Sequence, residues 1–168
     1  MAVIDAISTM YLEQNVATVE WTSLGTYDHL QIRGSVYTSA SVVQSALFIQ
    51  MNSDTTTGNY SCHRMYSYPS GASSYAFHLA TVGEAFANGY QMIVPAYSNF
   101  IADIYDYRNT SKFTFARVHS GYNATGTAHY NEIELGSHHS TSAVTSIKLR
   151  ISAGYNITRG SSFTLYGI

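Results

Sequence analysis

Alternating side-chain polarity, with a period of two residues, is the feature of this 168-residue chain that most limits its fold. In the segment 28–36, Leu30 and Ile32 lie on one face of an extended chain, and Gln31 and Arg33 lie on the other. Successive side chains of a β-strand point to opposite faces, whereas the apolar residues of a helix recur every three or four positions. The pattern therefore predicts half-buried β-strands and argues against a helical body.

Ten segments of the chain have strand character, and turn-forming stretches such as SDTTTGN, PSGASS and GSHHSTS separate them. The segments are 16–21, 28–36, 45–51, 60–68, 91–95, 98–107, 112–120, 129–137, 145–152 and 162–168. Short strands with polar connections and only two prolines predict an all-β fold, either an antiparallel sandwich or a barrel. The best helix candidates are a turn at the N-terminus and the stretch 74–87, which reads equally well as a loop with an edge strand.

The predicted strand 129–137 carries acidic and apolar residues in alternation. Ile133 and Leu135 share one face, and Glu132 and Glu134 share the other. We expect the apolar face to be buried and the glutamates to form a solvated acidic edge. Two carboxylates could serve glycoside hydrolysis, but residues i and i+2 lie about 6.5–7 Å apart on one strand and do not flank a cleft. With no nucleophile elbow or phosphate-binding loop in the sequence, we expect no enzymatic activity.

The chain carries little charge for its size. Lysine, arginine, aspartate and glutamate make up 11% of the residues, against about 25% in a typical globular domain. The net charge of −2 gives no basic field for nucleic acid and no polybasic patch for a membrane, so neither partner is expected. Tyrosine, serine and threonine must cover much of the surface, and such a surface suits packing against other protein.

Cysteine and histidine give little reason to expect a metal or a cofactor. The single cysteine, Cys62, lies in a predicted strand, and we expect it to be a small core residue. His138 and His139 are neighbours, which point to opposite faces in an extended strand, and we expect both to be solvated in the turn 136–142. Since no cysteine or carboxylate stands beside them at ligand spacing, no metal and no cofactor is expected.

The first fourteen residues form a segment with an apolar side. Val3, Ile4, Ile7 and Met10 precede the first convincing strand. The segment 1–14 is either an arm that docks on a neighbouring subunit or on the capsid lattice, or an extra strand of the sandwich. Residues 15–168 form a single β-sandwich domain in both cases. Under the arm interpretation, the four apolar residues are candidate interface residues.

Four tyrosines, Tyr60, Tyr66, Tyr68 and Tyr75, lie in or beside predicted loops. Tyrosine combines a large rigid ring, ordered at low entropic cost, with a hydroxyl group that can form hydrogen bonds. It therefore suits a protein interface, a glycan contact or a β-sandwich core. We include these four residues in the candidate interface and keep the core and glycan interpretations open.

Two stretches of the sequence, SLGTYDHLQIRGSV and SIKLRI followed by GSSFTLYGI, carry a recognisable pattern. They resemble a family of virion structural proteins from tailed bacteriophages, in which an early Y-x-H-L-x-(I/L)-R-G strand is matched by a closing GS-x-F-x-LYGI strand. The matching residues are Tyr27, His29, Leu30, Ile32, Arg33, Gly34, Ile147, Leu149, Gly160, Ser161, Phe163, Leu165, Tyr166, Gly167 and Ile168.

The resemblance implies a jelly-roll-like β-sandwich that assembles as a homotrimer and occurs in the virion. It brings no catalytic constellation. The expected function is that of a capsid decoration, or cement, protein on the capsid surface, which binds the major capsid protein and stabilises the head. The alternative is a receptor-binding or carbohydrate-binding module of a tail or head fibre, with host glycan as its partner.

Overall fold

The alternating segments form twelve β-strands and one short 3-10 helix, η1 (Ser152–Gly154), in the part of the chain that the structure describes. The structure, a computed structural model, describes residues 4–40, 45–56, 58–68, 71–80, 83–87, 97–123 and 129–168. At residues 68, 75–80, 83–87, 123 and 129 it describes the backbone alone.

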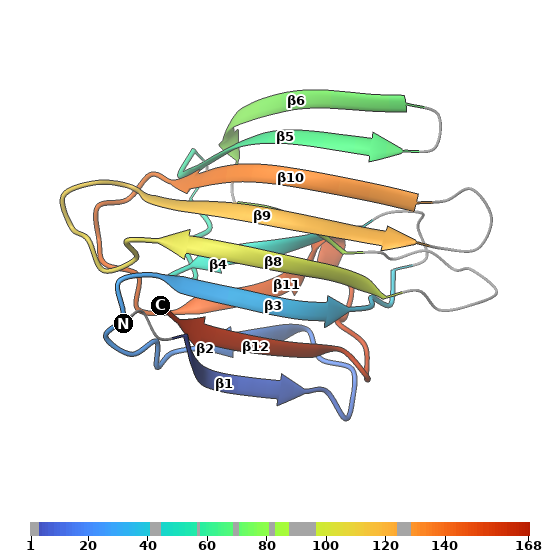
Figure 1. Cartoon of the computed structure of the whole chain (residues 1–168), viewed down its shortest axis with the longest axis horizontal. Helices are drawn as coiled ribbons and strands as arrows, with labels where there is room; N and C mark the ends of the chain where they lie inside the picture. The colour runs from blue at the N-terminus through green and yellow to red at the C-terminus, as the bar shows by residue number, and fades with distance from the viewer. Residues whose placement is uncertain are drawn as a thin grey trace.

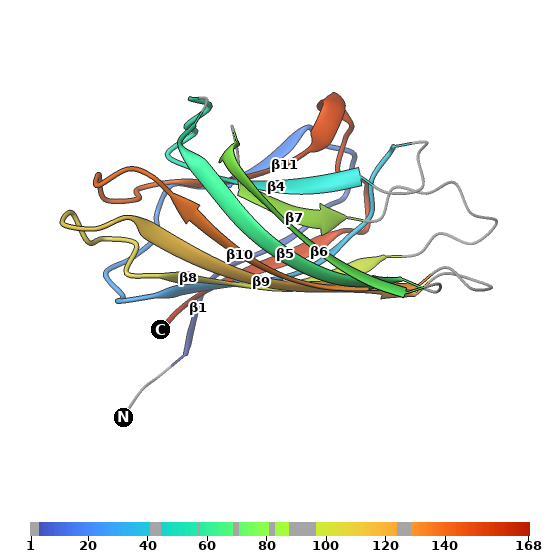
Figure 2. The same cartoon turned by 90° about the horizontal axis from the view of Figure 1, so that it is seen from above.

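The strands form two antiparallel sheets that pack face to face (Figures 1 and 2). The larger sheet contains, in spatial order, β1 (Asp5–Tyr11), β12 (Ser162–Gly167), β3 (Leu30–Val36), β8 (Ser98–Tyr105), β9 (Thr114–Asn123), β10 (His129–His138), β5 (Tyr60–Tyr68) and β6 (Gly71–Ala80). The smaller sheet contains β2 (Thr18–Trp21), β11 (Ile147–Ile151), β4 (Ser45–Met51) and β7 (Gly83–Ala87).

The connectivity is that of a jelly roll with additions. When β1, β12 and the hairpin β9–β10 are set aside, the strand orders are 3-8-5-6 and 2-11-4-7. The chain then crosses between the sheets at most connections, as in an eight-stranded jelly roll. The prediction of an antiparallel jelly-roll-like β-sandwich is therefore confirmed. The additional strands make one sheet twice as wide as the other.

The described residues of the stretch 74–87, which are 74–80 and 83–87, are extended, so the helix interpretation was wrong and the edge-strand interpretation is confirmed. Strand β6 pairs with β5 at one edge of the larger sheet, and β7 pairs with β4 at one edge of the smaller sheet. These pairings override the weak local preference for a helix. The N-terminal helical turn is also replaced by a strand, β1. The predicted strand 91–95 lies outside the described residues.

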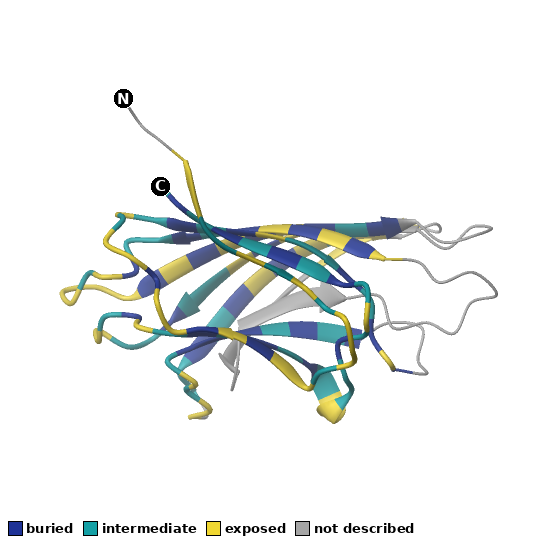
Figure 3. Ribbon diagram, turned by 90° about the horizontal axis from the view of Figure 1, so that it is seen from below, coloured by how far each residue is buried: buried dark blue, intermediate teal, exposed yellow. Residues whose placement is uncertain are grey.

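The hydrophobic core lies between the smaller sheet and the part of the larger sheet made by β12, β3, β8 and β9. Leu30, Ile32, Leu149 and Leu165 are fully buried there. Each such side chain contributes about 1.5–3 kcal/mol relative to an exposed position. Figure 3 shows buried and exposed residues alternating along the strands. No described residue of β10 or β5 belongs to this core cluster, so the sandwich is filled differently beneath these strands.

Strands β3 and β12 carry most of the two sequence motifs, and they are neighbours in the sheet. The SIKLRI part of the second motif lies on β11, in the smaller sheet. Leu30 lies opposite Gly167 in the antiparallel register. The ring of Tyr27 packs so closely on Gly167 that a Cβ atom there would clash with it. The backbones of His29 and Ile168 exchange two hydrogen bonds, each 3.0 Å long. The two motifs, far apart in the sequence, therefore form one structural unit.

Strand β1 adds to this unit at the edge of the larger sheet, beside β12. Ile7 and Met10 are partly buried and pack against the core, whereas Ile4 and Tyr11 are exposed. Figure 2 shows the beginning of β1 leaning away from the body of the sandwich. From residue 5 onward the N-terminal segment is thus a strand of the sheet, and its contact with a neighbouring subunit stays a prediction.

Candidate functional site

In strand β10, the acidic face is buried and the apolar face is exposed, which is the reverse of the prediction. Glu132 and Glu134 point into the sandwich and are 6% and 3% exposed. Ile133 and Leu135 lie on the outer face and are 41% and 40% exposed. The expectation of a solvated acidic edge was therefore wrong. β10 lies between β9 and β5, inside the sheet, and its inward side chains have no sheet edge at which to reach solvent.

Arg64 of β5 explains why two glutamates can point inward. It is buried, and it lies directly opposite Glu134 in the β10–β5 register. Its Nε forms an ion pair with Glu132 Oε1, and its Nη2 donates to Glu134 Oε2 at 3.0 Å. A buried carboxylate without a cation would carry a desolvation penalty of several kcal/mol, which this guanidinium offsets.

The cluster of Arg64, Glu132 and Glu134 has the geometry of a structural ion network. A glycosidase places two carboxyl groups on either side of the bond that it cleaves. Here both carboxylates belong to one strand and contact the same guanidinium in the interior of the sandwich. The chemistry that this arrangement supports best is the partial neutralisation of two carboxylates by one shared guanidinium beneath β10 and β5.

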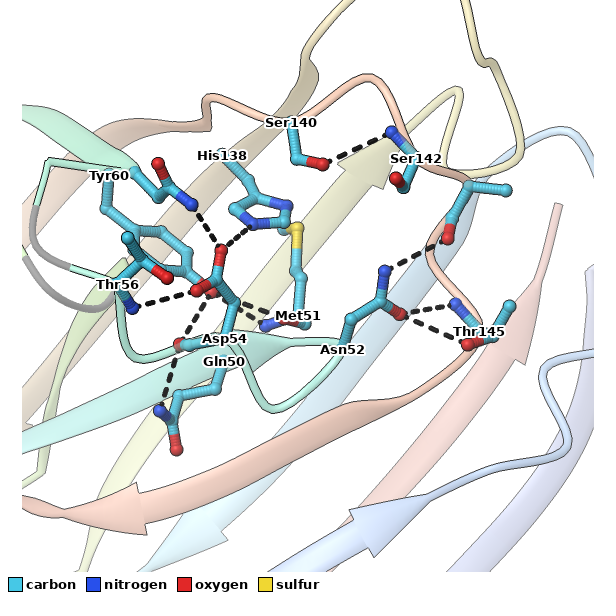
Figure 4. A network of polar contacts seen from close by, with 12 residues as sticks. Gln50, Met51, Asn52, Asp54, Thr56, Tyr60, His138, Ser140, Ser142 and Thr145 are labelled. Atoms are coloured by element: carbon cyan, nitrogen blue, oxygen red, sulfur yellow. Dashed lines mark hydrogen bonds and ion pairs between the residues drawn. The ribbon is translucent and has the colours of Figure 1, made fainter.

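A second polar cluster lies at the end of β10, around Asp54 (Figure 4). Asp54 Oδ2 lies 2.9 Å from Nε2 of His138 and accepts a 2.7 Å hydrogen bond from the amide of Asn59. The backbone N–H of Thr56 donates to Asp54 Oδ1 at 2.8 Å. His138 is buried and stacks on Tyr60, with ring centroids 4.8 Å apart. The expectation that His138 is a solvated loop residue was wrong, because the side chain of His138 is buried at the end of β10.

These contacts change the acidity of the groups involved. Burial alone would raise the pKa of Asp54, but the hydrogen bonds from Asn59, His138 and Thr56 outweigh it and hold the pKa well below its usual range. Burial raises the pKa of Tyr60 to about 12. Asp54 is therefore ionised and Tyr60 is neutral at neutral pH. The ionised carboxylate of Asp54 can then hold His138 of β10 through the contact described above.

The outer face of the larger sheet carries a row of exposed side chains that crosses four neighbouring strands. We call this row the ridge, and it consists of Ile101 of β8, His119 of β9, Ile133 of β10 and Met65 of β5. Each of these residues lies directly opposite the next in the strand register. Ile101 and Met65 are 44% and 61% exposed. Exposed apolar side chains grouped on a regular surface, here with His119 between Ile101 and Ile133, are typical of contact sites for other molecules.

Two shallow hollows lie along one side of the ridge, and both open on the outer face. The first, of about 270 Å³, lies over Gly121 and is lined by side chains of Asn99, Ile101, His119 and Asn131. The second, of about 480 Å³, is lined by side chains of Asn131, Ile133, Met65, Ser67, Ala72 and Ser74. Small residues at their floors create both hollows, and Asn131 belongs to both. We call the two hollows together the groove.

The candidate interface residues from the sequence fall into several places. Ile4 is exposed at the start of β1, and Ile7 and Met10 pack against the core. Tyr60 is buried at 2% exposure, so it belongs to the interior in this structure. Tyr66 is partly buried on β5. Val3 and the side chains of Tyr68 and Tyr75 lie outside the description.

The ridge was not recognised from the sequence, although one signal was present. Ile101 interrupts the alternation of the predicted strand 98–107, and because Phe100 faces the core, Ile101 must face outward. Met65 gave no such signal. The direction of Ile133 depends on Arg64, which lies 70 positions from Glu134 and was not among the candidate residues.

The described residues contain no group of three or more histidine, cysteine or carboxylate side chains that could hold a metal ion. Within the same residues, no helix has both the length and the apolar character needed to cross a membrane. Cys62 is buried, as expected. Comparison of the sequence with models of known protein families finds no match, and comparison with curated proteins finds no significant relative.

Proposed function

We propose that this chain is a non-enzymatic virion structural protein of a tailed bacteriophage, and that it acts as a capsid decoration, or cement, protein. The observation that carries the proposal is the ridge, whose apolar residues Ile101, Ile133 and Met65 stand 41–61% exposed on a regular sheet face. The three exposed apolar side chains, with His119 between Ile101 and Ile133, gain free energy when other protein covers them.

The unit formed by β3 and β12 also supports the proposal. Most of the residues that resemble the phage virion family lie on or beside these two paired strands, where Leu30, Ile32 and Leu165 are fully buried. The other two, Ile147 and Leu149, are buried on β11 of the smaller sheet. The motifs therefore encode the packing of this part of the sandwich and form a coherent fold signature. They contain no open acid, base or nucleophile arrangement.

The mechanism is additive contact energy. A cement protein that touches adjacent subunits of the major capsid protein adds interfaces that exist only in the intact shell. A specific and stable contact needs about 800 Å² of buried surface per partner. Assembly with copies of itself would strengthen attachment, because a unit held at one contact has its other contacts at high effective concentration.

The edge strand β1 is the proposed contact with the capsid. Ile4, just before β1, and Tyr11, at its end, are exposed. Among the described strands, β1 has a neighbour on one side only. Unpaired backbone groups at a sheet edge can pair with another chain. Removal of residues 1–12 is expected to leave a folded sandwich in which β12 is the new edge strand. The truncated chain is expected to bind capsids more weakly, because the proposed contact strand is missing.

The location of the protein in purified particles tests the proposal. A decoration protein is expected in many copies over the shell in a cryo-EM map. The truncated chain is expected to keep its far-UV circular dichroism spectrum and to lose occupancy on the shell. A protein found only at the tail, or one whose truncated form occupies the shell as fully as the full chain, would contradict the decoration role.

The larger hollow of the groove favours a second candidate function, the binding of host glycan by a tail or head fibre. Ser67, Ser74 and Asn131 place hydroxyl and amide groups around it, beside the apolar side chain of Met65. Such a mixture of polar and apolar groups suits a sugar ring. A glycan-array screen with the full chain distinguishes the two candidates, because a decoration protein is expected to give no specific signal.

A further inference from the structure

A small cavity lies inside the sandwich, where the hydrophobic core meets β10 and β5. Its volume is about 20 Å³, and residues of both sheets line it. Ile49 and Met51 of β4 belong to the lining from the smaller sheet, and Glu134 and His138 of β10 belong to it from the larger sheet. A cavity needs about 10–15 Å³, measured in the same way, to hold one water molecule. This cavity therefore has room for one water molecule and for no larger ligand.

The cavity lies beneath Gly136, which has no side chain to fill it. Gly136 stands between Glu134 and His138 on the inner face of β10, and all three residues line the cavity. A Cβ atom at Gly136 would meet only one described atom within 4 Å, the backbone oxygen of Ser61 at 3.6 Å. The space of one side chain is thus left open between two buried polar residues.

Two buried polar atoms beside this space need a hydrogen-bond partner. Nδ1 of His138 and Oγ1 of Thr114 have none among the described residues, although both side chains are only 1% exposed. Thr114 lies directly opposite His138 in the register of β9 and β10, two positions before Ala116, which lines the cavity. Native proteins give almost all such buried groups a partner, which is either a protein group or an ordered water molecule.

The chemistry of the imidazole ring makes water a suitable partner for Nδ1. Nε2 of His138 lies 2.9 Å from the carboxylate of Asp54, which is ionised and can only accept, so Nε2 donates. Nδ1 then accepts a hydrogen bond if the ring is neutral and donates one if the ring is charged. Water can do both. Figure 4 shows this second ring nitrogen turned away from Asp54.

We infer that one water molecule binds in this cavity as a fixed part of the structure, with hydrogen bonds to His138 Nδ1 and Thr114 Oγ1. Residues directly opposite each other on antiparallel strands have Cβ atoms about 4.5–5.5 Å apart, so one water molecule can reach both side chains. The water connects β9 to the polar cluster around Asp54, because His138 bonds both. This binding site is independent of the proposed function.

A crystal structure of the full chain, at a resolution that shows ordered water, tests the inference directly. One peak of water density is expected in the cavity, within about 2.7–3.2 Å of both His138 Nδ1 and Thr114 Oγ1. Gly136→Ala places a methyl group in the cavity and is expected to remove the peak while the fold is kept. A wild-type cavity without the peak, or the same peak in Gly136→Ala, would overturn the inference.

Thr114→Val tests the inference in solution, because the sign of its effect depends on the water. Valine has the shape of threonine without the hydroxyl group. Loss of a hydrogen bond to the water is expected to lower the folding equilibrium constant, measured by urea denaturation, at least about fivefold. Removal of a buried hydroxyl that has no partner would instead leave this constant unchanged or raise it. That result would contradict the site.

Thr18→Val is the matched control for this measurement. It makes the same change at an exposed position of β2, away from the cavity. The folding equilibrium constant of Thr18→Val is expected to stay within about twofold of the wild-type value. An equal loss in both variants would show that the effect of Thr114→Val is a general effect of valine in a strand, and the inference would fail.

Discussion

Two parts of the same eight-stranded sheet are built in opposite ways. In the apolar part, made by β12, β3 and β8, residues such as Ile32 and Leu165 face the core. In the polar part, made by β10 and β5, Arg64 and Glu134 face inward and Ile133 faces solvent. Alternation is equally clear in both parts. It separates the two faces of a strand, but it does not say which face is inside.

The difference follows from what covers each part. The smaller sheet has four strands and cannot supply apolar cover to all eight strands of the larger one. The core cluster ends at β9. Beyond it, β7 packs against β10 and β5, and the backbone N–H of Met51 at the end of β4 donates to the hydroxyl group of Tyr60 on β5. Beneath β10 and β5, an ion network fills the space that hydrophobic packing fills elsewhere, which leaves apolar residues of these strands on the outer face.

Removal of Arg64 is expected to have the largest effect on this arrangement. Arg64→Met would leave Glu132 and Glu134 buried without this guanidinium, and the free energy of unfolding is expected to fall by about 3–5 kcal/mol. Urea denaturation followed by circular dichroism measures the change. The control Arg117→Met, at an exposed ion pair with Asp103, is expected to change stability little.

A triple variant sharpens the same test. Arg64→Met combined with Glu132→Leu and Glu134→Leu removes the whole ion network and is expected to be neutral or more stable than the wild type by about 1–4 kcal/mol. If Arg64→Met alone lowered the free energy of unfolding by less than about 1 kcal/mol, Glu132 and Glu134 would not be buried as charged groups that depend on Arg64. The inward direction of the acidic face of β10 would then be wrong.

The next effect compares isoleucines on the two sides of the sheet. Ile32→Ala removes a fully buried side chain of β3 and is expected to cost about 2–5 kcal/mol. Ile133→Ala, the matched change on the outer face of β10, is expected to stay within about 0.5 kcal/mol of the wild type. Equal losses at the two positions would show that Ile133 is a core residue after all.

The fold was predictable from the sequence because its information is local. Alternation located the strands that contain Leu30, Leu149 and Phe163, and all three of these side chains are buried. The face of β10 was not predictable from its own residues, because it depends on Arg64, on a strand that precedes it by some 60 residues. A signal was nevertheless present in that strand, where Arg64 alternates with Cys62 on what otherwise reads as an apolar face. The inward arginine of β5 required an oppositely charged side chain on the inner face of its neighbour β10, and Glu134 supplies it.

The smallest of these effects is a dependence on pH that arises in the polar part alone. The pKa of Asp54 is lower in the folded chain than in the unfolded chain, where it is about 3.9, so folding favours the ionised carboxylate. The stability that this contributes is fully present above about pH 4 and is lost as the pH falls below that value. Asp54→Asn is therefore expected to lower stability by about 1–3 kcal/mol at pH 7, through weaker hydrogen bonds from His138, Asn59 and Thr56.

Urea denaturation of wild type and Asp54→Asn between pH 7 and pH 3 measures this contribution. The difference in free energy of unfolding between the two proteins is expected to shrink toward pH 3. Protonation of Asp54 in the wild type removes the same negative charge that Asp54→Asn removes. Asp106→Asn is the control, since Asp106 pairs with Lys112 in an exposed turn and should change stability much less. A difference that stays constant over this pH range would mean that the carboxylate charge does not hold the loop 52–59 to β10. The polar part of the sheet would then depend on Arg64 alone for its electrostatic stability.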